Sequence, residues 1–245
     1  MALDIALIVV GLLIFVVSII SLVVSIWLAI RYSKYNKREN SAGFTGQEIA
    51  RKILDDQGLS HIKVSVTGSL MFGNSYSHYF KKVRLRRMTR HETSLTALGM
   101  GAQKAALAVL AKEGDPDMKK RIRLVPLITF GPFAFIPLVI VGAVLDYYFF
   151  NQSGVCTIAL GSLGLLFYVY SIVLSVITLK TEKKAQTRAY EILGSYGIIN
   201  EEELASLKDL FHLYNVQYVN DIILACLELI YTVLKIVAAL KGNKD

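Results

Sequence analysis

The chain has few of the residues that build covalent or metal-bound frameworks. Only two of its 245 residues are cysteines and only four are histidines. Cys156 and Cys226 each lie in or beside an apolar stretch, and no Cys-x-x-Cys pair is present. These absences argue against a disulfide framework and against a cysteine-based metal site. The sequence also lacks a glycine-rich phosphate loop and a Gly-x-Ser-x-Gly nucleophile motif, which disfavours nucleotide-binding and serine hydrolase classes.

Charged residues are absent from three long stretches, residues 5–30, 124–145 and 155–179. About 20 apolar residues are enough for a helix to cross the hydrocarbon core of a bilayer. The composition is 54% hydrophobic, which is high for a soluble domain. The sequence therefore predicts transmembrane helices within residues 1–30, 124–145 and 155–179, and the lipid bilayer is an expected partner.

Residues 219–240 form a fourth apolar stretch, which carries a polar stripe. Asp221, Glu228 and Lys235 recur every seven residues and therefore share one face of a helix. A polar stripe in a membrane faces protein or water and not lipid. Two interpretations stay open: a fourth transmembrane span whose polar stripe faces a partner, or a helix at the membrane interface whose polar stripe faces water.

The basic residues are concentrated between the first two apolar stretches. Residues 31–123 hold 19 of the 27 Lys and Arg but only 8 of the 19 Asp and Glu. Because basic loops stay on the cytoplasmic side, this asymmetry predicts a cytoplasmic domain at residues 31–123 and an N-terminus outside. Residues 180–218 are expected to form further cytoplasmic helices. No nucleic-acid-binding motif accompanies the charge, so nucleic acid is not an expected partner.

Two helices are predicted in the cytoplasmic domain. Residues 41–58 contain a capping box, Thr45 followed by Glu48, ahead of an apolar face. Residues 94–110 form a second helix, dominated by Gly and Ala and ended by Gly114. Such small side chains allow very close packing against a neighbour.

Two alternating stretches lie between these helices, residues 61–70 and 80–87. They predict two strands joined by a loop at residues 73–79. The second stretch exposes Lys82, Arg84 and Arg86 on one side, which suits the edge of a sheet.

Several motifs, in this order, resemble the YugP-type membrane zinc metallopeptidase family. They are SAGFTGQEIARKIL at 41–54, NSYSHYFKKVRL at 74–85, the small-residue helix, RIRLVPL at 121–127 and AQTRAYEILGSYGIINEEEL at 185–204. The resemblance implies a mainly α fold: a polytopic helical membrane protein of three to four spans with a small α+β zinc-peptidase-like cytoplasmic domain.

The chemistry of that family depends on a His-Glu-x-x-His motif in the central helix, where two histidines bind zinc and the glutamate activates water. Alignment with the family pattern puts Gln103 and Leu107 at the histidine positions and Lys104 at the position of the general base. The third ligand position falls on Glu182. The resemblance thus implies that these are degenerate former-site positions, with no zinc cofactor, no metal ligands and no catalytic residues. We also expect Lys104 to pair with Glu182 across the former site.

The sequence therefore favours a pseudoenzyme. Such a chain would act as a scaffold, adaptor or accessory subunit through protein–protein interaction, in a membrane protein complex or a homo-oligomer. The possible partner-facing stripe is the one on residues 219–240. The alternative is an active divergent membrane zinc metallopeptidase. Because the family is chiefly bacterial, a prokaryotic cell membrane is the expected location.

Overall fold

A computed structural model describes residues 2–67, 73–125, 134–149 and 154–242. The chain forms two compact units, each built from segments that are distant in sequence. The first unit contains Met1–Leu22, Arg123–Ile177 and Val219–Asp245, and the second contains Val23–Ile122 and Thr178–Tyr218. The first unit thus collects most of each apolar stretch, and the second collects nearly all of the predicted cytoplasmic segments.

Three long helices contribute residues to both units: α1 (Ala2–Asn36), α7 (Val155–Ser195) and α8 (Glu201–Gly242). Among the described residues, three helices are long and apolar enough to cross a membrane, namely Leu3–Asn36, Val155–Ser195 and Glu201–Ala239. A shorter apolar helix, α6 (Phe135–Phe149), begins inside the predicted second span. Residues 126–133 of that predicted span lie outside the described residues. The expected fold class, mainly helical with a small sheet, is confirmed.

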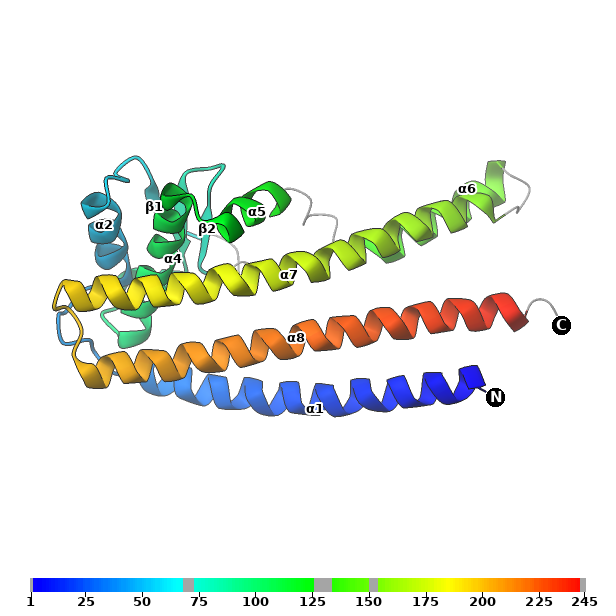
Figure 1. Cartoon of the computed structure of the whole chain (residues 1–245), viewed down its shortest axis with the longest axis horizontal. Helices are drawn as coiled ribbons and strands as arrows, with labels where there is room; N and C mark the ends of the chain where they lie inside the picture. The colour runs from blue at the N-terminus through cyan, green and yellow to red at the C-terminus, as the bar shows by residue number, and fades with distance from the viewer. Residues whose placement is uncertain (1, 68–72, 126–133, 150–153, 243–245) are drawn as a thin grey trace. The chain divides into compact units, whose positions relative to one another are not determined.

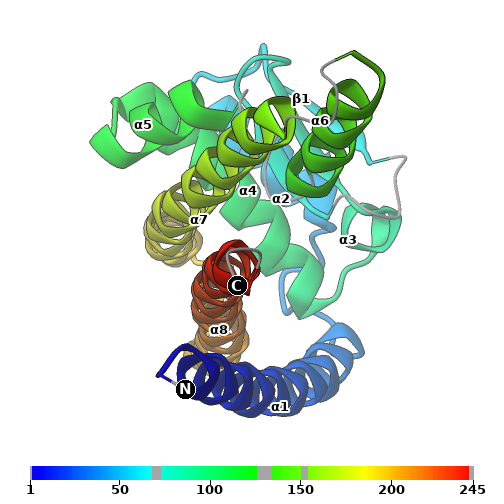
Figure 2. The same ribbon diagram turned by 90° about the vertical axis from the view of Figure 1, so that its right-hand side faces the viewer.

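Two pairs of helices in the first unit lie beside each other. The part of α1 in this unit runs beside the C-terminal part of α8 (Figures 1 and 2), and a Cβ on Gly11 would lie 3.9 Å from the ring of Tyr231. A Cβ on Gly142 of α6 would lie 2.6 Å from the Cα of Thr157, so only glycine fits between α6 and α7 there. Asp146, 4% exposed, accepts a hydrogen bond from the Thr157 N–H at 2.8 Å, which satisfies a free donor at the start of α7.

In the second unit, α2 (Gly46–Asp56) begins at the predicted capping box. The Thr45 hydroxyl accepts from the Glu48 N–H at 3.2 Å, and the Glu48 carboxylate accepts from the Thr45 N–H at 2.8 Å. The apolar face of α2 is fully buried, with Ile49 and Ile53 both 0% exposed. The capping prediction is confirmed.

The central helix is α4 (Leu95–Glu113), and every residue from 95 to 110 is buried. The Ser94 side chain caps its start, and Gly114 ends it with φ 75°. Helices α2 and α4 lie beside the strands of this unit (Figure 1). A Cβ on Gly101 would lie only 2.3 Å from the carbonyl oxygen of Gly46, so α4 approaches the start of α2 at backbone distance. The small residues of α4 make this approach possible.

The sheet differs from the prediction. Its strands are β1 (Lys63–Val66), β2 (Ser75–Ser77) and β3 (Lys82–Leu85), in the order β1-β3-β2. The segment predicted as a loop thus contains β2, a strand too short to show a hydropathy alternation. β3 is central and not an edge, because β1 pairs with it in parallel and β2 in antiparallel. Its polar side chains remain partly exposed on one face while Val83 and Leu85 are buried on the other.

The end of α7 and the start of α8 complete the core of the second unit. The face of α7 that carries Ala185, Ala189 and Leu193 is buried, and it belongs to the same continuous helix as the preceding apolar stretch. Asn200 caps α8, and its side-chain oxygen accepts from the Glu203 N–H at 2.8 Å. Two short helices, α3 (Arg87–His91) and α5 (Pro116–Leu124), flank α4 in sequence.

Candidate functional site

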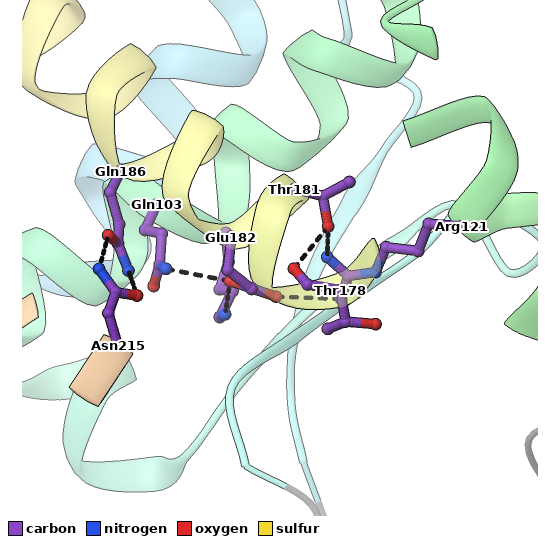
Figure 3. Close-up of polar contacts among 8 residues, drawn as sticks. Gln103, Arg121, Thr178, Thr181, Glu182, Gln186 and Asn215 are labelled. Atoms are coloured by element: carbon purple, nitrogen blue, oxygen red, sulfur yellow. Dashed lines mark hydrogen bonds and ion pairs between the residues drawn. The ribbon is translucent and has the colours of Figure 1, made fainter. Parts of the chain in front are cut away.

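The second unit contains a buried charge cluster centred on Glu182 (Figure 3). One carboxylate oxygen, Oε2, accepts from Lys104 Nζ at 2.7 Å and from Gln103 Nε2 at 3.0 Å. The other, Oε1, accepts from Arg121 Nη2 at 3.0 Å. The side chains of Lys104, Arg121 and Glu182 are 11%, 15% and 15% exposed. The ion pair expected between Lys104 and Glu182 is therefore present.

Three helices position these groups. Gln103 and Lys104 project from α4, Glu182 from α7, and Arg121 from α5. The Arg121 guanidinium is held from a second side, because its Nη1 donates to the Thr181 hydroxyl at 2.8 Å. Sequence reasoning assigned Arg121 no role at the site, because it was interpreted only as part of the basic region 31–123 and of the motif at 121–127.

The electrostatics of the cluster favour an ionised Glu182. Burial alone raises the pKa of this carboxyl, but the charges of Lys104 and Arg121 and their hydrogen bonds outweigh burial and lower the pKa below its ordinary value. Glu182 lies beyond residue 179, where the charge-free stretch of α7 ends. One anion here faces two cations, so the cluster carries a surplus positive charge.

Leu107, at the remaining former-site position, is a core residue. Its side chain is 0% exposed and belongs to the main hydrophobic cluster of the second unit. Being one turn beyond Gln103, it shares that face of α4 and offers only hydrocarbon to the cluster.

A pocket of about 350 Å³ adjoins the charge cluster within the second unit. Gln103, Lys104 and Glu182 line it, and so does an amide pair that the sequence did not predict. In that pair Gln186 and Asn215 exchange two hydrogen bonds, of 3.1 and 2.8 Å (Figure 3). No local sequence signal joins these two residues, which come from different helices.

The predicted polar stripe lies on α8 in the first unit. Asp221, Glu228 and Lys235 are all exposed. The Tyr168 hydroxyl donates to Glu228 Oε2 at 3.1 Å, and the Lys235 ammonium lies 5.1 Å from the ring centre of Tyr231. The Glu228 carboxylate thus has a neutral partner in its own unit.

The histidines are dispersed. His78 contacts the Tyr76 hydroxyl through Nδ1 at 3.2 Å, and His61, His91 and His212 lie on other segments. Within the described parts of the chain, no three His, Cys, Asp or Glu side chains come together in a way that could hold a metal ion.

Comparison with known proteins gives the family. The profile described as "Putative neutral zinc metallopeptidase" matches residues 10–237. The chain belongs to this family. It is 27% identical over 200 residues to "Putative membrane protease YugP" of Bacillus subtilis (strain 168), which covers 81% of this chain and 84% of that protein. No solved structure matches. Together with the candidate spans, this relationship makes the chain an integral membrane protein.

The donor set at the charge cluster does not fit the zinc ion that the family name implies. Structural and catalytic zinc sites use imidazole, thiolate and carboxylate ligands. Here a single carboxylate, Glu182, stands with the amide of Gln103 and the hydrocarbon of Leu107. The ammonium of Lys104, in direct contact with that carboxylate, has no lone pair to offer a metal while it is protonated.

Proposed function

We propose that this chain is a catalytically inactive member of its family that acts by binding, as a scaffold, adaptor or accessory subunit of a membrane protein complex. The observation that carries the proposal is the ion-paired cluster of Glu182 with Lys104 and Arg121, at 2.7 and 3.0 Å. The carboxylate that resemblance assigns to the metal is already compensated by two protein cations.

A dication added to this cluster would be repelled. At an effective dielectric constant of about 20, two unit charges about 4 Å apart interact by roughly 4 kcal/mol. A zinc ion near Glu182 carries two charges, so its repulsion by Lys104 and by Arg121 would each be twice this energy. Only one carboxylate, that of Glu182, would attract it. The protein would therefore have to lose a proton or move two side chains before a metal could bind.

The same cluster argues against general-base catalysis. A general base must accept a proton from water in the transition state. Lys104 occupies the position that resemblance assigns to that base, and its ammonium donates to Glu182 Oε2 at 2.7 Å, so it has no lone pair to accept a proton from water. No other carboxylate lines the adjoining pocket among the described residues.

The polar stripe on α8 supports the binding of a partner within the membrane. Glu228 is nine residues from the start of the 219–240 apolar stretch, or about 14 Å at 1.5 Å per residue. That puts it near the middle of a hydrocarbon core about 30 Å thick, where a charged side chain costs about 3 kcal/mol or more. A transmembrane helix of a partner that donates hydrogen bonds to Glu228 would offset this cost. In this proposal residues 219–240 span a prokaryotic cell membrane, and residues 31–123 are cytoplasmic.

The test is the zinc content of the detergent-solubilised full chain after dialysis against a mild chelator. We expect well below one zinc per chain in a protein that elutes as a single folded species. About one zinc per chain would refute the proposal and restore the alternative, an active divergent membrane zinc metallopeptidase. The matched control is the triple variant Gln103→His, Lys104→Glu, Leu107→His, which rebuilds the family motif and should retain zinc under the same dialysis.

A further inference from the structure

The pocket beside the charge cluster is lined by residues that directly adjoin the membrane stretches in sequence. Tyr32 follows residues 5–30, Leu179 ends residues 155–179, and Tyr218 precedes residues 219–240. Chain continuity therefore places this wall of the pocket at the depth of the lipid headgroups, where tyrosine is enriched in membrane proteins.

Most polar groups of the pocket are committed to protein partners. Asn74 donates to Thr89 and accepts from a backbone N–H, and Gln103 and Lys104 both donate to Glu182. The two amides opposite them bond to each other. Among the charged and amide side chains that line the pocket in the described structure, the exception is the guanidinium of Arg86.

Arg86 is held at the pocket by its backbone. It follows β3, and its N–H donates to Asn74 Oδ1 at 2.7 Å. The facing residue is Gly73, whose missing side chain leaves room, since a Cβ there would lie 3.9 Å from Arg86 Nη2. Among the residues that the structure describes, no acceptor is bonded to this guanidinium, which is exposed and lines the pocket. Its fork of donors matches the oxygens of a phosphate group.

The charge of the pocket also favours an anion. Its lining contains Arg86, Lys104 and Glu182, and Arg121 stands directly behind Glu182. These four groups leave two positive charges in excess. The nearby acid Glu92 is engaged elsewhere, because it accepts a hydrogen bond from Asn36 at 3.0 Å and lines a different pocket.

We propose that this pocket binds a phosphate-bearing anion through Arg86, and that the source is the headgroup of an anionic phospholipid. The apolar side chains of Met100, Leu179 and Phe211 also line the pocket and would contact the glycerol and the first methylenes of the lipid. This proposal goes beyond the proposed function as a catalytically inactive scaffold and does not depend on it. Its test measures lipid binding, and neither zinc content nor proteolysis enters the result.

The experiment titrates the full chain, in a nonionic detergent, with three probes by calorimetry. They are short-chain phosphatidylglycerol, phosphatidylcholine with the same acyl chains, and glycerol 3-phosphate. We expect phosphatidylglycerol to bind most tightly. Arg86→Gln should weaken that binding about 10- to 100-fold, as loss of charge-assisted hydrogen bonds does. Arg87→Gln, the same change at an exposed neighbour outside this pocket, should leave it unchanged.

Each contrary result has a definite meaning. Equal weakening by Arg86→Gln and Arg87→Gln would mean general surface attraction and would overturn the site. Equal affinity for phosphatidylcholine would overturn the selection of an anion. Glycerol 3-phosphate binding as tightly as the lipid would overturn the lipid source and indicate a soluble phosphate ligand. If Arg86→Gln does not fold, Arg86→Lys serves instead: it keeps the charge without the fork, and unaltered affinity would refute the role of the guanidinium.

Discussion

Replacing Glu182 by glutamine should destabilise the second unit more than any other single change in the charge cluster. Glu182→Gln removes the counter-charge of two cations, Lys104 and Arg121, whose side chains are only 11% and 15% exposed. Removing one partner of a buried ion pair costs about 3–5 kcal/mol. For a chain of this size that corresponds to a loss of about 6–20 °C in the unfolding midpoint. Lys104→Met should cost less, about 1–2 kcal/mol, because Glu182 keeps Arg121.

The dependence on pH follows from the same contacts. The pKa of Glu182 is lower in the folded protein than its ordinary value of about 4.3. Near that pH the unfolded chain binds more protons than the folded one. The stabilisation from Glu182 is therefore complete above about pH 4.3 and is lost as the pH falls through the folded pKa. Glu182→Gln should lack this acid-dependent contribution.

The assay is thermal unfolding of the detergent-solubilised chain, followed by far-ultraviolet circular dichroism between neutral pH and about pH 3.5. Asp55→Asn is the matched control. It removes an acid from an exposed pair with Arg51, at 2.8 Å, and exposed pairs contribute only about 0.2–1 kcal/mol. If Glu182→Gln shifted the midpoint no more than Asp55→Asn, the buried ion-pair argument would be wrong.

Two further predictions concern close packing and the stripe. Gly101→Ala should lower the free energy of unfolding by about 1–3 kcal/mol, because the new Cβ would lie 2.3 Å from the Gly46 carbonyl oxygen. Gly99→Ala should lower it less, because its new Cβ meets the end of the Leu207 side chain, which can move. Both variants are compared with the original chain by thermal unfolding. Glu228→Gln should reduce the fraction of the chain that co-purifies in a higher-mass membrane complex several-fold, as measured by native mass spectrometry. Glu201→Gln, at the exposed start of α8, should leave that fraction unchanged, and an equal loss in both variants would contradict a partner at Glu228.

Local signals in the sequence predicted the local structure well. The capping box at Thr45 and the end of α4 at Gly114 each depend on residues within one helical turn, and each is present. The pairing of Lys104 with Glu182 was also expected, although only through resemblance to a family pattern.

Non-local pairing could not be predicted in the same way. The parallel partner of β3 and the short strand β2 depend on register between segments that carry too few residues to show a pattern. Arg121 reaches Glu182 from 61 positions away in sequence, and no spacing rule connects them. Arg86 was visible as a basic strand residue, but its place at a pocket depends on how four helices meet in the second unit.

The complete burial of α4 has a consequence for biogenesis. Part of its cover comes from Leu207, which lies against Gly99 and leaves the ribosome long after α4 does. At about 5–20 residues per second, residue 218 follows residue 122 by roughly 5–20 seconds, and the apolar stretches at 124–145 and 155–179 are made in between. During this interval α4 is synthesised but lacks its final cover. The second unit can therefore complete its core only after both intervening apolar stretches have been synthesised, because its residues 178–218 follow them in the chain.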